Sequence, residues 1–299
     1  MRMRKAVITA AGHGTRLFPA TKAVKKELFP LVDRDGCIKP ILQMIVEEAV
    51  ESGIEEVCIV VAPGGDEPLR DYFAKPMSEE LERRIAKSPE LYEQYRHVRD
   101  LNDRLNYAFQ HTQEGYGHAV YCAREWVGNE PFVLLLGDHI YVSGTEERCT
   151  RQVLDAFELK GATVSALART PEPMLKYFGT IGGTPDPSMP GLYKAAEIVE
   201  KPSVEYAREH FRIEGLPEGE YMTWFGMHAM MPEIFECLEY HIKNDIRERG
   251  EIQFTSAQEL LRQRHGDYYG LEVNGSRHDI GIPTGYASTM ALLAGIEQR

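Results

Sequence analysis

Three short apolar runs, each followed closely by glycine, most strongly constrain how this chain can fold. They lie at 5–10, 57–62 and 132–136. Such runs do not alternate apolar with polar residues, so they predict strands that are buried on both faces of a sheet. Between the first two runs, the apolar residues of 41–50 recur at helical spacing. Strand, helix and strand in this order predict a βαβ unit, and hence a parallel sheet covered by helices.

Three residues lie at the carboxyl ends of predicted strands: Ala10, Gln110 and Asp138. In open α/β sheets, ligands bind beyond the carboxyl ends of the strands. We therefore expect these three positions to border one crevice.

Beyond residue 162 the pattern becomes typical of hairpins. Strands are predicted at 163–167, 178–183, 195–202 and 223–231, and a Pro/Gly/Asp-rich stretch at 184–191 predicts a loop. The charged residues 66–104 predict inserted surface helices. Other helices are expected near 146–159, from a cap at Thr255 or Ser256, and over 283–296. These elements predict an α/β fold with a Rossmann-like mixed, largely parallel sheet flanked by helices and a small antiparallel lobe.

The segment after the first strand has the features of a phosphate-binding loop. Gly12 and Gly14 lack a Cβ atom, so their backbone can take positive φ and let N–H groups converge on an anion. Positive charge follows in a chain that is acidic overall, at Arg16, Lys22, Lys25 and Lys26. An ordinary turn with a solvated basic face is the alternative. The Walker pattern is excluded because Gly-Lys-Ser/Thr is missing, and the dinucleotide fingerprint because Leu17 stands where it needs a third glycine.

The run A-A-G-H-G-T-R-L at 10–17, with A-T-K-A-V-K-K-E-L-F-P at 20–30, resembles the N-terminal signature of the sugar-1-phosphate nucleotidylyltransferases. Within that superfamily, A-T-K-A-x-x-K-E is most similar to the bacterial uridylyltransferases that act on glucose 1-phosphate. The resemblance extends from Lys5 to about Ile296 and is densest at 10–30, 115–122, 251–257 and 278–281. Three residues depart from the family pattern: His13, Lys25 and Phe178.

The resemblance implies transfer of a nucleotidyl group to a sugar 1-phosphate, with release of pyrophosphate. The attacking phosphate is already a nucleophile, so the protein must position two anions and neutralise their charge. Amides of the loop, including those of Gly14 and Thr15, and the side chains of Arg16 and Lys26 are expected to hold the triphosphate. Arg16 can bind in a fork, whereas Lys26 supplies a point charge for the α-phosphate.

A divalent cation usually completes such a site, and it prefers carboxylate oxygens. Asp138 and Asp279 match the aspartates that hold Mg²⁺ in the resembling family. A helix cap or turn is the commoner role of a single strand-end aspartate. His278-Asp279 also suggests a metal phosphohydrolase of the HD type, but no upstream His and distant Asp complete that pattern.

By the same resemblance, Gln110 and Gly115 occupy uracil-reading positions, and Ala11, Gly12 and Glu27 lie near the base and ribose. A carboxamide offers both a donor and an acceptor to the edge of a base. The alternative for Gln110 is a satisfied surface amide.

The sugar side is matched by Gly179, Glu200 and Lys201. Glu200 is expected to accept hydrogen bonds from sugar hydroxyls, Lys201 to bind the sugar phosphate, and Gly179 to leave room for the ring. A solvated ion pair is the alternative for the Glu200-Lys201 dipeptide.

Composition argues against several other classes of protein. Asp and Glu number 46 against 34 Lys and Arg, a formal charge of -12, which disfavours binding to nucleic acid or to an anionic membrane. The five cysteines lack C-x-x-C spacing, so we expect reduced thiols in a cytoplasmic protein without a zinc site. No signal-peptide core follows the basic N-terminus, and no run approaches the ~18 apolar residues of a membrane span.

We therefore expect one domain over residues 1–299, with a nucleotide-binding half at about 1–145 and a sugar-binding half at about 146–299. The resemblance implies a homo-oligomer, dimeric or tetrameric, that makes UDP-glucose from UTP and glucose 1-phosphate with Mg²⁺. Alternatives are a different base (dTTP or CTP), a different sugar 1-phosphate, or a sugar-nucleotide-binding regulator without activity. A regulator has no need for the full set of Arg16, Lys26, Asp138, Lys201 and Asp279.

Overall fold

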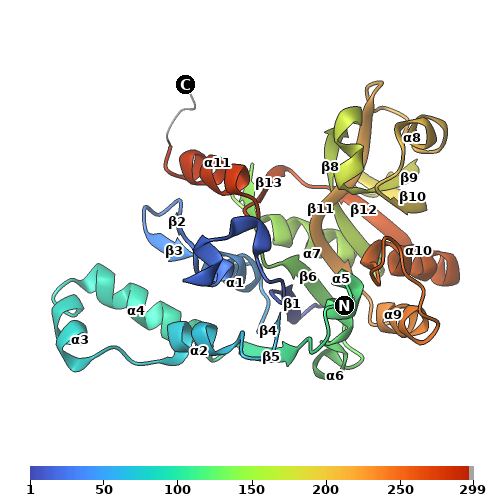
Figure 1. The fold of residues 1–299 in the computed structure, drawn as a ribbon. Coiled ribbons are helices and arrows are strands. Elements are labelled where there is room, and N and C mark those ends of the chain that lie inside the picture. The colour runs from blue at the N-terminus through green and yellow to red at the C-terminus, as the bar shows by residue number, and fades with distance from the viewer. Residues whose placement is uncertain (296–299) are drawn as a thin grey trace.

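One sheet runs through the computed structural model, which describes residues 1–295 (Figure 1). Its nine strands have the order β5-β4-β1-β6-β11-β8-β12-β10-β9. The first four in this order are β5 (Leu105–Phe109), β4 (Glu56–Val61), β1 (Lys5–Thr9) and β6 (Phe132–Leu136). The other five are β11 (Glu220–Met230), β8 (Thr163–Pro171), β12 (Tyr268–Glu272), β10 (Leu192–Glu200) and β9 (Gly179–Pro185).

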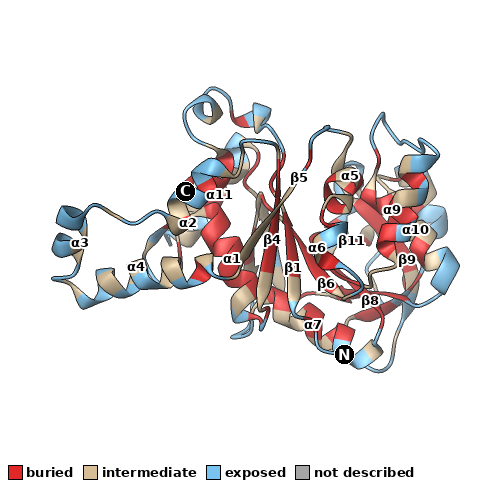
Figure 2. Cartoon of the chain, turned by 90° about the horizontal axis from the view of Figure 1, so that it is seen from below, coloured by how far each residue is buried: buried red, intermediate tan, exposed pale blue. Residues whose placement is uncertain are grey.

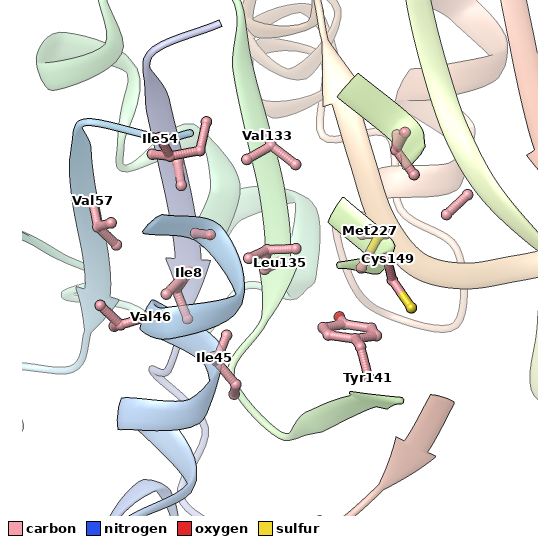
Figure 3. Packing of buried hydrophobic residues seen from close by; sticks show 14 of the residues in the cluster. Ile8, Ile45, Val46, Ile54, Val57, Val133, Leu135, Tyr141, Cys149 and Met227 are labelled. Carbon is pink, nitrogen blue, oxygen red and sulfur yellow. The ribbon is translucent and has the colours of Figure 1, made fainter. Parts of the chain in front are cut away.

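The first four strands are mutually parallel, and β1 lies between β4 and β6. Val7 and Ile8 are both fully buried, in hydrophobic clusters on opposite faces of the sheet. On one face, Ile8 lies close to Ile45 and Val46 of α1 (Ile41–Glu51), as Figure 3 shows. Because both faces are covered, the interiors of β1, β4 and β6 are apolar, and their polar residues, Lys5, Thr9 and Glu56, stand at strand ends. The prediction of buried parallel strands is confirmed.

The second half of the sheet is mainly antiparallel. β11 lies antiparallel to both β6 and β8, and β10 lies antiparallel to β12 and β9, whereas β8 and β12 are parallel. A register shift in β11 between Trp224 and His228 accompanies Gly226, whose φ is 95°. The mixed α/β class is therefore confirmed, but the description as largely parallel holds only for the first half. Here β9 and β10 form a hairpin, whereas helical segments lie in the connections from β10 to β11 and from β11 to β12.

Two small sheets complete the strands: β2 (Pro30–Val32) with β3 (Ile38–Pro40), and β7 (His139–Ser143) with β13 (Gly275–Asp279). In the second, Asp279 is paired with His139. This pairing brings the C-terminal part of the chain to the carboxyl end of β6, where Asp138 lies. It is the element of the fold that makes two distant aspartates neighbours.

Most of the helices cover the sheet, and those of the 66–104 insertion form an arm. Those against the main body are α1, α5 (Tyr116–Tyr121), α6 (Arg124–Val127), α7 (Cys149–Lys160), α8 (Val204–His210), α9 (Ile234–Lys243), α10 (Phe254–His265) and α11 (Pro283–Leu293). The predicted insertion at 66–104 contains α2 (Glu67–Ala74), α3 (Glu79–Ile85) and α4 (Pro89–Asn102). In Figures 1 and 2 it projects from the body, and α3 and α4 are mostly exposed or half-buried.

Two helix boundaries differ from the prediction. α10 begins at Phe254 after Gln253, so Thr255 and Ser256 lie inside the helix and do not cap it. The hydroxyl of Thr255 instead makes a tertiary contact, described below. α11 ends at Leu293, and the predicted end at Ile296 lies outside the described residues. None of the helices within residues 1–295 has both the length and the apolar character needed to cross a membrane.

Candidate active site

The loop after β1 turns at Gly14. Gly14 has a φ of 65°, and a Cβ atom there would lie 2.9 Å from Cγ2 of Thr21. It precedes the 3₁₀ turn η1 (Thr15–Leu17), in which Thr15 is exposed. The expected positive φ thus occurs at Gly14 but not at Gly12. The absence of a side chain at Gly12 instead leaves room beside Lys26, whose Nζ would be 3.7 Å from a Cβ at that position.

Lys26 and Asp138 form an ion pair across the strand ends. Nζ of Lys26 lies 2.8 Å from Oδ2 of Asp138, and Nδ1 of His139 lies 3.2 Å from Oδ1. Burial alone would raise the pKa of Asp138, but the hydrogen bond from His139 and the charge of Lys26 hold that pKa well below its usual range. The carboxylate is therefore ionised at neutral pH.

Arg16 joins the second predicted aspartate to this pair. Nη2 of Arg16 lies 3.8 Å from Oδ2 of Asp138, and Nη1 lies 3.6 Å from Oδ2 of Asp279. A Cβ atom on Gly281 would lie within 3.0 Å of a carboxylate oxygen of each aspartate and 2.8 Å from Nη2 of Arg16. The three side chains therefore converge on one point. Gly281 leaves that point free, and its N–H donates to Oδ1 of Asp279 at 2.8 Å.

The two carboxylates fit a hard divalent cation. They approach one point from separate elements of the fold, and the carboxylate of Asp138 is held in its charged form. Within residues 1–295, no group of three or more His, Cys, Asp or Glu side chains forms an all-protein metal site. Mg²⁺ needs no such cage, because it keeps several waters and is commonly held by one or two carboxylates and substrate phosphates.

Glu27 lies beneath the lysines of the loop. Its carboxylate is fully buried, 3.6 Å from Nζ of Lys25 and 3.8 Å from Nζ of Lys26. Neither oxygen has a hydrogen-bond partner within residues 1–295, and burial raises the pKa of Glu27. In this arrangement the side chain holds the two lysines, and a direct contact with a nucleotide stays a prediction.

The predicted base-reading residues are adjacent, and Gln110 is not a surface amide. Gln110 is 3% exposed, and its Nε2 lies 3.2 Å from the carbonyl oxygen of Gly115 and 3.2 Å from Nδ1 of His118. The nearby Gln113 donates from Nε2 to the carbonyl oxygen of the buried Ala11 at 3.1 Å. The loop after β5 is thus fixed to the loop after β1.

Gly115 is required by the close approach of a second segment. It has a φ of 113°, and a Cβ atom there would lie 2.7 Å from Cβ of Glu251 and 2.8 Å from the carbonyl oxygen of Ile252. Backbone hydrogen bonds of 2.9 and 2.8 Å join Gly117 and Glu114 to Ile252. Residues from the two halves of the chain therefore meet directly at the loop that is predicted to read the base.

At the predicted sugar side, the indole ring of Trp224 lies close beside Gly179. A Cβ atom on Gly179 would collide with the indole ring of Trp224 and would lie 3.0 Å from Oε2 of Glu200. Trp224 is 7% exposed. The absence of a side chain at Gly179 makes room for Trp224, and the expectation that it also leaves room for a sugar ring stays a prediction. The indole forms the wall next to Glu200.

Glu200 is held by Thr255 and by Lys201. Oγ1 of Thr255 donates to Oε2 of Glu200 at 2.7 Å and accepts from Nε1 of Trp224 at 3.4 Å. Nζ of Lys201 lies 3.1 Å from Oε1 of Glu200. Lys201 has a φ of 49°, a left-handed conformation that is uncommon for a residue with a side chain and often marks a functional site.

Replacing Gly179 with alanine is expected to lower stability by about 1–3 kcal/mol, because the new methyl group overlaps the indole of Trp224. Chemical denaturation measures this change. A double-mutant cycle with Trp224→Phe is the control: the smaller ring should relieve part of the cost, so the two effects should not be additive. Additive effects would mean that Gly179 and Trp224 do not determine one another's position.

A buried polar network lies behind Trp224. Oγ of Ser165 is 2.7 Å from Nδ1 of His228 and 2.6 Å from the hydroxyl of Tyr268, to which Nε2 of Gln258 also donates at 2.6 Å. Burial lowers the pKa of His228 to about 3, so the imidazole is neutral in the folded protein. The ring packs edge-on against Trp224, with a centroid distance of 5.4 Å.

This neutral histidine should make the protein sensitive to acid. The unfolded chain binds a proton at His228 with a pKa of about 6.5, whereas the folded chain does not until about pH 3. The contribution to stability is thus present above pH 6.5 and is lost as the pH falls, by about 2 kcal/mol between pH 7 and 5. Urea unfolding at both pH values should show this extra loss in the wild type and in His265→Gln, an exposed control, but not in His228→Gln. An equal loss in all three would contradict the assignment.

The sites just described lie within one continuous match to a known family. Residues 5–294 match the family described as nucleotidyl transferase. The chain belongs to this family. UTP–glucose-1-phosphate uridylyltransferase of Bacillus subtilis (strain 168) is 36% identical to it over 290 residues, which cover 96% of this chain and 90% of the relative. The enzyme of the same name from Staphylococcus epidermidis is 33% identical over 290 residues, with coverages of 96% and 91%.

Solved structures share the fold of this nucleotidyl transferase. A UDP-glucose pyrophosphorylase complexed with UDP-glucose has a TM-score of 0.76 and 27% identity, with 99% of this chain and 100% of that chain covered. A UTP-bound UGPase from Acinetobacter baumannii has a TM-score of 0.76 and 25% identity, with coverages of 99% and 94%. The family resemblance read from the sequence is confirmed.

Three side chains of this nucleotidyl transferase were missed in the sequence: Trp224, Thr255 and Arg277. Thr255 lies in a segment of dense resemblance, but its position near a helix start suggested a cap. Trp224 and Arg277 contact residues distant in sequence, Gly179 and Phe178, so no local pattern indicates them.

Proposed function

We propose that this chain transfers the uridylyl group of UTP to glucose 1-phosphate and releases UDP-glucose and pyrophosphate. The observation that carries the proposal is the convergence of Arg16, Lys26, Asp138 and Asp279 beyond the carboxyl ends of β1 and β6. Both substrates are anions, so cations and a metal-binding carboxylate pair are the groups that their reaction needs. The names of the relatives supply the identity of the base and of the sugar.

In the proposed reaction, an oxygen of the sugar phosphate attacks the α-phosphorus of UTP. The bond from that phosphorus to the oxygen bridging the β-phosphorus breaks, and pyrophosphate leaves with the electron pair. No general base is required, because the attacking phosphate is already ionised. Lys26 is assigned to the α-phosphate, where charge changes during the reaction, and Arg16 to the outer phosphates together with the amides of Gly12, Gly14 and Thr15.

We assign the cation as Mg²⁺, to be held by Asp138 and Asp279. When bound, such an ion neutralises phosphate oxygens and orients the two reacting groups. The assignment is supported by the small carboxylate pair, which leaves coordination positions for water and phosphate.

Uracil is assigned to Gln110 and Gly115, with Ala11, Gly12 and Glu27 nearby for the base and ribose. The support is the burial of Gln110, because a buried amide that meets the wrong base is left with an unpaired group. The sugar hydroxyls are assigned to Glu200, beside Gly179, and the sugar phosphate to Lys201. We also propose the nucleotide-binding half at about 1–145 and the sugar-binding half at about 146–299, a cytoplasmic location, and a dimer or tetramer.

The base assignment predicts the order of donor substrates. With glucose 1-phosphate as acceptor, kcat/KM for UTP should exceed that for CTP or ATP by about a thousandfold or more, since a mismatch leaves buried hydrogen-bonding groups unpaired. Thymine differs from uracil by one methyl group, which is worth only about 1–3 kcal/mol, so dTTP should be a measurable second substrate. A preference for CTP or ATP over UTP would contradict the role of Gln110.

A further inference from the structure

Arg277 occupies a special place in β13. It lies two residues before Asp279, so the two side chains leave the same face of the strand. Ser276 and His278 leave the other face, where Oγ and Nε2 are 2.8 Å apart. The guanidinium carbon of Arg277 lies 3.8 Å from the centre of the Phe178 ring. Arg277 thus extends from the strand of a metal-binding aspartate to the residue that precedes Gly179.

The charge of Arg277 is not balanced by the protein. Four other cations of the site each have a carboxylate oxygen within 4.0 Å: Arg16, Lys25, Lys26 and Lys201. No carboxylate within residues 1–295 lies that close to Arg277. Its one side-chain hydrogen bond there is a long one of 3.4 Å, from Nη2 to the hydroxyl of Thr223. Most of its five N–H donors are therefore available to a ligand.

The partial burial of Arg277 makes the missing counter-charge significant. Arg277 is half-buried, and its guanidinium is a cation at neutral pH. A cation that is partly withdrawn from water is stabilised when an opposite charge or hydrogen-bond acceptors reach it. The ring of Phe178 holds the guanidinium plane but accepts none of its N–H groups in a linear hydrogen bond.

The position of Arg277 indicates which anion it would meet. The carbonyl oxygen of Phe178 accepts a hydrogen bond of 3.2 Å from the backbone N–H of Lys201. Arg277 is thus attached through Phe178 to the motif assigned to the sugar phosphate, and through β13 to Asp279. We propose that Arg277 binds the phosphate of the sugar 1-phosphate, and hence the sugar-side phosphate of the product, together with Lys201. This inference rests on the proposed function and adds a guanidinium fork to the point charge of the lysine.

The test compares two ligands that differ in this phosphate. UDP-glucose and UMP are titrated calorimetrically into the wild type, Arg277→Gln and Arg277→Lys. Arg277→Gln should bind UDP-glucose about tenfold or more weakly and UMP as the wild type does, because only UDP-glucose carries the sugar-side phosphate. The affinity of Arg277→Lys for UDP-glucose should lie between those of the wild type and Arg277→Gln, since lysine keeps the charge and loses the guanidinium fork. Arg169→Gln, at an exposed arginine paired with Glu272, is the matched control and should bind both ligands normally.

Each outcome decides the proposal. Equal loss of UMP and UDP-glucose binding would mean that Arg277 is structural, and unchanged binding of both would remove its role altogether. If Arg277→Gln does not fold, a selective loss of UDP-glucose binding in Arg277→Lys supports the proposal, and normal binding overturns it. If the wild type binds UMP but not UDP-glucose, the proposed function fails instead. In that case, inorganic phosphate is titrated in the presence of UMP. Weaker phosphate binding by Arg277→Gln than by the wild type supports the phosphate site at Arg277, and equal binding overturns it.

Discussion

Asp138→Asn is expected to slow turnover by about a thousandfold, equivalent to ~4 kcal/mol of transition-state stabilisation. The substitution preserves volume and removes the charge that faces Lys26 at 2.8 Å and converges with Asp279. The cation site would lose one of its two carboxylates, and Lys26 would lose its partner. Steady-state rates at saturating UTP, glucose 1-phosphate and Mg²⁺ measure the effect.

The matched control is Asp267→Asn, since Asp267 forms an exposed ion pair with Lys194 at 3.4 Å and should leave the rate unchanged. Near-wild-type turnover of Asp138→Asn at saturating Mg²⁺ would contradict the metal assignment. Circular dichroism of both variants separates a chemical effect from unfolding.

The substitution Asp138→Asn should also change how the stability of the protein depends on pH. The pKa of Asp138 is lower in the folded chain than the value of about 4 in an unfolded chain. Its contribution to stability is therefore present above pH 4 and is lost as the pH falls further through the folded pKa. The wild type should be more stable than Asp138→Asn at pH 7, and the difference should narrow below pH 4.

Lys26→Met should lower kcat by about a hundredfold or more, because a charge-assisted contact that strengthens at the α-phosphate is lost from the transition state. Lys201→Ala should instead raise KM for glucose 1-phosphate and change kcat less, since its contact with the sugar phosphate exists before and during the reaction. Lys194→Met, at an exposed lysine, is the control. Identical kinetic defects in the Lys26 and Lys201 variants would show that the two lysines do not have separate roles.

The parallel half of the fold could be predicted because burial on both faces leaves a local signal. Val7 and Ile8 contact different clusters, so the centre of β1 has no solvent face, and its polar residues, Lys5 and Thr9, stand at the two ends of the strand. The antiparallel half has no comparable signal. The pairing of β8 with β12 joins segments far apart in the chain, and a strand pattern alone does not say which partner a strand will take.

Some residues of the candidate site could likewise be predicted from the local sequence, and others could not. Lys26 and Asp138 could be proposed from a glycine-rich loop and a strand end, and the structure brings them into contact. The position of Asp279 depends on the pairing of β7 with β13, which no local pattern specifies. Thr255 resembles a helix cap in sequence, but it lies inside α10, and its hydroxyl donates to Glu200.

Gly179 illustrates a different limit. A glycine indicates that something approaches the backbone closely, but it does not say whether that neighbour is a ligand or a side chain. Here the neighbour is Trp224. The sequence could therefore indicate that Gly179 has a close neighbour without identifying that neighbour as Trp224.

The central claim is tested most directly by product analysis with the wild-type protein. UTP, glucose 1-phosphate and Mg²⁺ are incubated together, and UDP-glucose and pyrophosphate are quantified over time. Equal amounts of the two products, formed only when both substrates are present and abolished by excess EDTA, are the predicted result. Absence of UDP-glucose, or pyrophosphate release without transfer to the sugar phosphate, would contradict the proposal that this chain is a uridylyltransferase acting on glucose 1-phosphate.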